Sequence, residues 1–147
     1  MNLSQKCQYA VRGLLELAKR HGQGPVRIAE IAEAQAVPPR FLELILNELK
    51  QAGYVESRRG VQGGYMLAVS PGQLTVGEVI SLVDGPQTPV KCLNEPGTPE
   101  CPMYGRCAFL RLWERAAAAV AEVYDTTSFQ DLLDQEQAAM QVPAYCI

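Results

Sequence analysis

The chain has 147 residues, of which 48% are hydrophobic and 20% are charged, and its formal net charge is −3. This length and apolar content are sufficient for one domain with a sizeable core. The sequence contains no apolar run of membrane-spanning length and no recognisable signal peptide, so we expect a cytoplasmic protein without membrane association.

The charge is divided unevenly along the chain. Residues 1–60 contain nine Lys or Arg and six Asp or Glu, whereas residues 61–147 contain four and ten. A basic half joined to an acidic half is typical of a protein that presents one face to DNA. The same division of charge arises by chance in other soluble proteins, so it counts only as support for the sequence motifs described below.

The N-terminal part of the sequence predicts three helices. The first covers residues 3–21, with Ser4 as its N-cap, and the second covers residues 28–36. A third helix is predicted over residues 39–52, because proline is favoured in the first turn of a helix. The apolar residues expected to form its buried stripe are Phe41, Leu42, Leu44, Ile45 and Leu49.

A β-hairpin is predicted after the third helix. Residues 54–58 alternate in polarity, residues 59–64 form a basic turn with three glycines, and residues 65–68 form the return strand. A helix over residues 75–83 follows, and its Thr75 and Glu78 have the spacing of a capping box.

The C-terminal half changes character. Residues 84–106 contain five prolines and are expected to be irregular. A helix over residues 107–124 is more apolar than one packed face requires, and a short helix over residues 128–133 precedes a tail expected to be mobile. We therefore divide the chain into a DNA-binding unit (1–74), a connecting helix with a cysteine-rich loop (75–106), a dimerisation helix with a terminal helix (107–135) and a tail (136–147).

The order helix, turn, helix, β-ribbon is that of a winged helix-turn-helix, so the predicted fold is mainly α with a small β-hairpin wing. In the recognition helix, Arg40 has the chemistry to contact guanine or phosphate, and Glu43 to accept a hydrogen bond from cytosine. Asn47 is expected to be structural or solvated. The residues predicted to contact DNA are Gln5, Lys6, Pro39, Arg40, Glu43, Arg58, Arg59, Gly60 and Gln62.

Three segments carry a family resemblance: LSQKCQYAVRGLLELA, PVRIAEIAEAQAVPPRFLELILNELKQAGYVESRRGVQGGYMLA and TVGEVISLVDG. Together with the cysteines that follow, they resemble the Rrf2 family of bacterial winged-helix transcription regulators, of the IscR, NsrR and RirA type, over about residues 1–125. The resemblance implies a homodimer paired through residues 107–124, and an apolar helix suits such an interface. It also implies that the cysteines after the wing often hold an iron–sulfur cluster.

Five cysteines are present, which is an odd number and argues against a disulfide framework. Cys92, Cys101 and Cys107, here called the loop cysteines, are separated by eight and five residues. Zinc sites usually contain a closer pair, whereas iron–sulfur clusters accept wider loops. Because cysteines without a ligand role usually prefer cores to loops, their position favours a cluster.

The fourth ligand of such a cluster is open. Some relatives have a histidine three residues after the third cysteine, where this chain has Leu110, and others use an acid in the first helix, where it has Gln8. Cys7, beside Gln8, is a second weak candidate, with a packing role slightly favoured. His21 and Cys146 are expected to have no ligand role. The cluster type, 2Fe–2S or 4Fe–4S, is therefore undecided.

The sequence thus predicts a DNA-binding regulator, a repressor, that senses iron, redox state or nitric oxide through a cluster. The first alternative is a cluster-free thiol–disulfide switch in the same loop. The second is an iron–sulfur carrier that does not bind DNA. An enzyme is not expected, because the glycine run at 60–64 lies in a hairpin instead of before a helix, and no histidine is placed beside a nucleophile.

Overall fold

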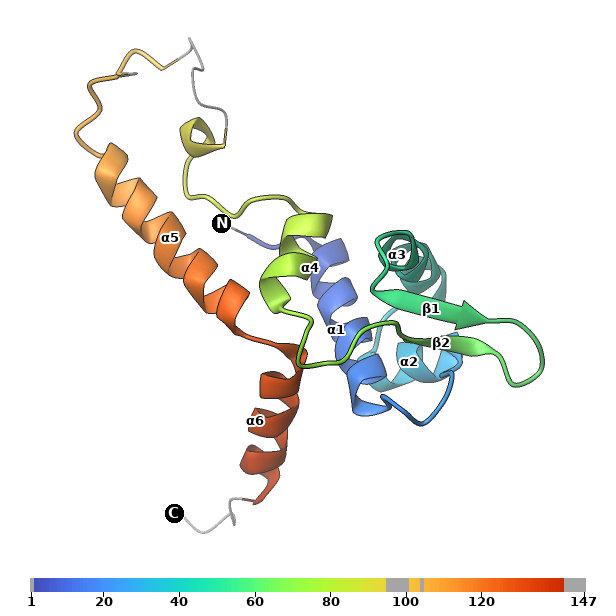
Figure 1. Ribbon diagram of the computed structural model, residues 1–147. Coiled ribbons are helices and arrows are strands. Elements are labelled where there is room, and N and C mark those ends of the chain that lie inside the picture. The colour runs from blue at the N-terminus through green and yellow to red at the C-terminus, as the bar shows by residue number, and fades with distance from the viewer. Residues whose placement is uncertain (1, 95–100, 104, 142–147) are drawn as a thin grey trace.

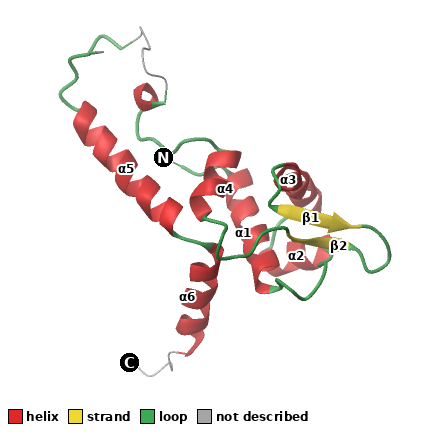
Figure 2. Cartoon of the chain, in the orientation of Figure 1, coloured by secondary structure: helices red, strands yellow, loops and turns green. Residues whose placement is uncertain are grey.

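A computed structural model describes residues 2–94, 101–103 and 105–141 of the chain. The described part is mainly helical with a two-stranded antiparallel hairpin, as the sequence predicts (Figures 1 and 2). Its elements are α1 (Gln5–Lys19), α2 (Ile28–Gln35), α3 (Pro39–Gln51), β1 (Val55–Arg58), β2 (Gly64–Leu67), α4 (Val76–Val83), the 3-10 turn η1 (Lys91–Leu93), α5 (Leu110–Thr126) and α6 (Phe129–Gln141).

Helix α1 is the centre of the packing, because it contacts α2, α3, α4 and α6. Ser4 caps it as predicted, since its hydroxyl oxygen accepts a hydrogen bond from the Cys7 amide at 3.0 Å. Leu14 and Leu17 are buried on α1 and join a single core with residues from the wing and from α6.

Helices α2 and α3 form the predicted helix-turn-helix, but the expected buried stripe of α3 is wrong at two positions. Phe41 is 41% exposed and Leu44 is 63% exposed. A helix turns 100° per residue, so the face that packs inward cannot include position 44 as well as positions 42, 45 and 49. The stripe that packs on the core is Leu42, Ile45, Leu46 and Leu49.

The hairpin is tied to the rest of the domain by a short extended segment before α2. Val55 pairs with Leu67 and Arg58 pairs with Gly64 across the hairpin. Val26 and Tyr65 exchange two backbone hydrogen bonds, each of 2.8 Å. Gly64 permits this approach, because a methyl group there would overlap the Val26 carbonyl.

The two C-terminal helices behave differently. Helix α5 begins three residues later than expected and extends away from the domain, with no buried residue along its length (Figure 1). Helix α6 is longer than expected and returns to the core, where Phe129 is fully buried. The Phe129 amide donates to the Leu74 carbonyl at 3.0 Å, so the start of α6 is fixed beside α4. The tail was expected over residues 136–147, but residues 136–141 belong to α6, and residues 142–147 lie outside the described residues.

Candidate nucleic-acid interface and cysteine loop

The outer face of α3 carries exposed polar side chains. Pro39 starts the helix, and Arg40 lies in the same exposed first turn. Glu43 and Asn47 follow at helical spacing on the same side. Burial, followed by the nearby charge of Glu43, raises the pKa of Tyr65, which is the second residue of β2, so Glu43 lies near the tip side of the hairpin.

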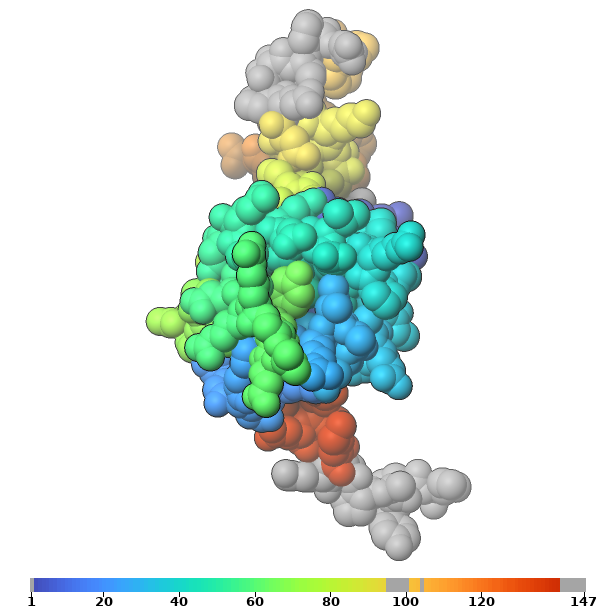
Figure 3. Space-filling view, turned by 90° about the vertical axis from the view of Figure 1, so that its right-hand side faces the viewer, coloured from blue at the N-terminus to red at the C-terminus, as the bar shows by residue number. Residues whose placement is uncertain are grey.

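The hairpin tip projects from the domain beside this face. Figure 3 views the molecule from the side of the tip, with the hairpin in front of the surface formed by the first three helices. The predicted contact residues Arg58, Arg59, Gly60 and Gln62 are all exposed there. The tip and the outer face of α3 therefore form one accessible surface, here called the wing–helix surface.

Arg27 also belongs to this surface, although no local pattern in the sequence points to it. Its guanidinium donates to the Val61 carbonyl at 3.1 Å and so holds the tip against the start of α2. A shallow hollow of about 410 Å³ lies beside it, and Arg27, Ser57, Arg58 and Arg59 are among the lining residues. Arg27 and Val61 are 34 residues apart in the sequence, so the periodicity of the helices and strands could not predict this hydrogen bond.

Gln5 and Lys6, the two residues at the start of α1 that were predicted to contact DNA, each interact with another side chain of the protein. The Gln5 amide donates to the Tyr9 hydroxyl at 2.9 Å, and Lys6 pairs with Glu48 at 2.6 Å. The Lys6–Glu48 pair is partly exposed, and such surface pairs contribute about 0–1 kcal/mol. Lys6 would therefore lose little by leaving Glu48 for a phosphate.

The loop cysteines are free and partly exposed, and Cys92 lies in η1. Thiolates are the usual ligands of iron–sulfur clusters, so the donor set fits such a group chemically. In the described residues, however, no three Cys, His, Asp or Glu side chains are grouped as a metal site. The loop cysteines therefore have suitable donor atoms for an iron–sulfur cluster. Their positions in this structure would have to change before they could bind one together.

The candidates for a fourth ligand differ in accessibility. Cys7 is fully buried, and burial, with the charge of Asp84 second, raises the pKa of its thiol to about 11. Both facts favour a protonated packing residue over a thiolate ligand. Gln8 is exposed, and its amide donates to the Leu3 carbonyl at 3.0 Å. His21 is exposed at the end of the α1 region, and Cys146 lies outside the described residues.

The start of the cysteine loop is attached to the N-cap of α1. The Ser4 amide donates to Asp84 Oδ2 at 2.7 Å, and the Ser4 hydroxyl donates to Asp84 Oδ1 at 2.5 Å. Asp84 is the C-cap of α4, the last residue before the loop. The pair, here called the Ser4–Asp84 clasp, links the loop to the helix on which the DNA-binding domain is built.

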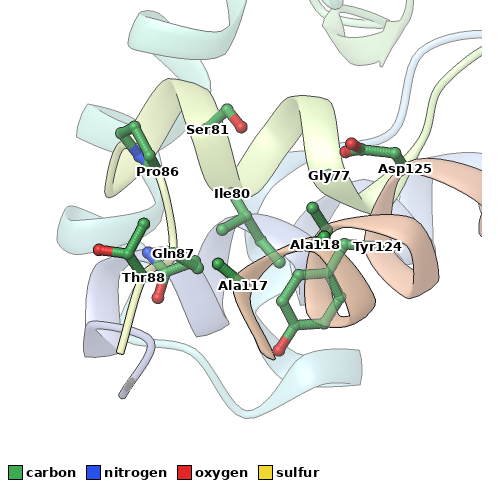
Figure 4. Close-up of a pocket in the computed structure, with 11 residues that line it drawn as sticks. Gly77, Ile80, Ser81, Pro86, Gln87, Thr88, Ala117, Ala118, Tyr124 and Asp125 are labelled. Atoms are coloured by element: carbon green, nitrogen blue, oxygen red, sulfur yellow. The ribbon is translucent and has the colours of Figure 1, made fainter. Parts of the chain in front are cut away.

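A cavity of about 290 Å³ separates the first loop residues from α5 (Figure 4). Pro86, Gln87 and Thr88 line it from the loop, and Ala117 and Tyr124 line it from α5. Because this space is not filled by side chains, residues 86–88 are not fixed against α5 by close packing.

Helix α5 exposes an apolar face. Phe109, just before it, is 61% exposed and stacks at 6.3 Å on the ring of Trp113. Leu112 and Val123 are 52% and 60% exposed. An apolar helix face of this kind marks an interaction surface more often than a solvated one.

The chain is similar to known transcriptional regulators over almost its whole length. The model of the Rrf2 family, described as iron-dependent transcriptional regulators, matches residues 3–135. The HTH-type transcriptional regulator CymR of Bacillus subtilis is 38% identical over 144 residues, covering 95% of this chain and 96% of CymR. The HTH-type transcriptional regulator IscR of Aliivibrio salmonicida is 35% identical over 133 residues, covering 90% of this chain and 77% of IscR.

Solved structures agree with the sequence comparisons. The structure of CymR (YrzC), the global cysteine regulator of B. subtilis, superposes with a TM-score of 0.77 at 36% identity, covering 92% of this chain and 98% of CymR. The relatives are regulators, which confirms the expectation that the chain is not an enzyme. No helix in the described part of the chain is both long and apolar enough to cross a membrane.

Proposed function

Because this chain belongs to the Rrf2 family of transcriptional regulators, we propose that it is a homodimeric repressor whose operator affinity is controlled by an iron–sulfur cluster on the loop cysteines. The observation that carries the DNA-binding half of the proposal is the wing–helix surface. There, Arg40 and Glu43 on α3 and Arg58 and Arg59 on the wing are all exposed. A helix presents base-reading groups to the major groove, while arginines at the wing suit the negative minor groove.

The individual contacts follow from this docking. Arg40 and Glu43 read bases, and Pro39 packs at the groove edge. Gln5, Lys6, Gly60 and Gln62 contact the backbone through side chains or amide groups. Arg27 supports the wing from behind through Val61.

The apolar face of α5 supports homodimerisation. Phe109, Leu112 and Val123 remain exposed in the single chain. Pairing two copies through residues 107–124 buries these side chains and places two recognition helices on one duplex. Their separation must match half-sites about one DNA turn apart. The pairing of the two α5 helices therefore sets the distance between the recognition helices, and so the spacing of the half-sites that the dimer can bind.

The loop cysteines supply the signal. Three thiolates would hold the cluster, whose oxidation, nitrosylation or loss of iron is the chemical event sensed. The fourth ligand and the cluster type, 2Fe–2S or 4Fe–4S, stay open: exposed Gln8 is the better-placed candidate, because Cys7 is buried. Gathering the three thiols would draw η1 toward the start of α5 and so order the loop.

Two features connect the loop to the DNA-binding surface. At one end the Ser4–Asp84 clasp joins the loop to α1. At the other end the loop leads directly into α5, across the cavity lined by Gln87 and Tyr124. When the cysteine loop becomes ordered or disordered, the change is therefore transmitted both to α5 and to the DNA-binding unit.

The second candidate is a cluster-free thiol regulator of the same dimer. It is favoured by the similarity to the global cysteine regulator CymR, and by the loop cysteines, which are free and which, among the residues that the structure describes, are not grouped as a metal site. In this version a disulfide between two loop cysteines bends the loop. The surface that binds DNA is the same in both versions.

Anaerobic purification followed by ultraviolet–visible and electron-paramagnetic spectroscopy distinguishes the versions. The cluster proposal expects a coloured, iron-containing protein whose binding to a selected operator changes when the cluster is removed and restored. A colourless, iron-free protein whose DNA binding ignores reconstitution contradicts it. A loop disulfide found by mass spectrometry after mild peroxide, with no iron present, would support the thiol version instead.

A double Arg58→Ala, Arg59→Ala variant tests the DNA interface separately. We expect loss of DNA binding with the spectrum unchanged, because the wing is remote in sequence from the loop cysteines. A control is Lys19→Ala, which removes an exposed cationic side chain at the end of α1, outside both the wing–helix surface and the proposed dimer helix. A protein without salt-dependent DNA binding would favour the iron–sulfur carrier.

A further inference from the structure

Leu44 is an apolar side chain on an otherwise polar surface. It is 63% exposed and lies near the middle of α3, one turn after Arg40 and one turn before Asn47. The inward stripe of the helix is already complete with Leu42, Ile45, Leu46 and Leu49. Leu44 therefore contributes nothing to the core and points away from the domain on the wing–helix surface.

A single exposed leucine needs no explanation by itself, since apolar atoms form much of any protein surface. Its position is what matters here. The first half of a recognition helix enters the major groove, and Leu44 is on the outer face of that half, at helical spacing from Arg40. The wing–helix surface also carries the exposed basic side chains of Arg40, Arg58 and Arg59, and positive charge of this kind complements duplex DNA.

The major groove offers one apolar group, the C5-methyl of thymine. A leucine has no donor or acceptor, so it cannot read adenine as asparagine or glutamine would. It can distinguish thymine from cytosine, because cytosine lacks the methyl group. The neighbouring exposed ring of Phe41 is less suited to the task, because it packs edge-on against Tyr9 with ring centres 5.8 Å apart.

We infer that Leu44 is a specificity-determining residue of α3 that packs against the C5-methyl group of a thymine in each operator half-site. The inference rests on the proposed function, since it requires α3 to enter the major groove. It goes further in assigning a base to a residue that carries no polar group. Burying one carbon is worth about a fourfold change in affinity. With one such contact in each half-site of a dimer, the combined effect is roughly fifteenfold.

The test removes the methyl group and nothing else. Full-length, anaerobically isolated protein selects binding sites from a randomised duplex pool, and the preferred duplex is made with each thymine replaced in turn by deoxyuridine, in both half-sites together. Fluorescence anisotropy at fixed salt then gives Kd. At one thymine position we expect the wild-type protein to bind roughly fifteenfold more weakly, and the Leu44→Ala variant to bind both duplexes equally.

Two further variants make the test decisive. Leu44→Met keeps an apolar side chain and should retain most of the sensitivity to deoxyuridine, whereas Leu44→Gln should lose it. Met140→Ala, which removes a 77% exposed side chain on α6, should behave as wild type. Both positions are exposed, so the midpoint of thermal unfolding should stay within about 2 °C of the wild-type value.

The outcomes separate the two proposals. If no duplex is selected by the wild-type protein, the proposed function fails and this inference fails with it. If a duplex is selected but deoxyuridine affects wild type and Leu44→Ala alike at every position, only the Leu44 assignment is overturned. A Leu44→Ala variant with unchanged DNA binding but altered oligomeric mass also overturns it, since Leu44 would then face another copy of the chain.

Discussion

The Ser4–Asp84 clasp should have a measurable energy of its own. Replacing Ser4 by alanine removes both the cap on the Cys7 amide and the 2.5 Å hydrogen bond to Asp84. Loss of an N-cap costs about 1 kcal/mol. A hydrogen bond to a charged group is worth more than a neutral one, but the clasp is exposed, so we assign it about 0.5–1 kcal/mol. Ser4→Ala should therefore lower the free energy of unfolding by about 1.5–2 kcal/mol.

Asp84→Ala should cost less. It removes two hydrogen bonds from Ser4, but it also removes a negative charge from the C-terminal end of α4, where the helix dipole disfavours it by about 0.3–0.5 kcal/mol. The expected net loss is about 0.5–1 kcal/mol. The double variant should lose less than the sum of the two, because the shared hydrogen bond can be removed only once.

Urea unfolding of the four proteins measures this coupling, which we expect at about 0.5–1 kcal/mol. In thermal unfolding, each 1 kcal/mol corresponds to about 2–4 °C for a chain of this size. Additive effects of Ser4→Ala and Asp84→Ala would refute the clasp as a link between α1 and the cysteine loop. Glu78→Ala is the matched control, because it removes another cap carboxylate of α4 that makes no contact with Ser4.

Three other predictions concern the core, the cysteines and pH. Phe129→Ala should lower the free energy of unfolding by about 3–5 kcal/mol in urea titrations, because a fully buried ring is lost; a loss under 1 kcal/mol would mean that α6 does not share the α1 core. Alkylation of native, metal-free protein should label the loop cysteines before Cys7, which mass mapping would detect; equal labelling would contradict the burial of Cys7. Hydrogen bonds from the Ser128 hydroxyl and amide lower the pKa of Asp131 below its unfolded value, so this carboxylate stabilises the fold above that unfolded value and the contribution disappears as pH falls through the folded pKa. Asp131→Asn should therefore flatten the decline of stability below about pH 4 in unfolding measured across pH, and an unchanged acid limb would show that Asp131 does not contribute to it.

Much of the architecture follows from local sequence signals. Pro39 sets the start of α3, Thr75 and Glu78 close a capping box on α4, and both expectations agree with the structure. The glycines between the strands mark the hairpin turn. These features depend on neighbours within a few residues, so the chain order is enough to identify them. The three loop cysteines can likewise be identified from the sequence, because they lie within sixteen residues of one another.

Where a helix faces, and what a distant segment touches, required the tertiary structure. The apolar run at 44–46 made Leu44 resemble a core residue. Helical spacing separates Leu44 from the face of Leu42, Ile45 and Leu49, and the packing of α1 against α3 decided which of the two faces is buried. Arg27 reaches Val61 across the wing, and Ser4 reaches Asp84 across 80 residues. The sequence by itself therefore determined the order of the elements, the family and the spacing of the loop cysteines. The tertiary structure alone decided which side chains of those elements are exposed on the wing–helix surface and how the loop is joined to α1, because both depend on contacts between segments that periodicity does not encode.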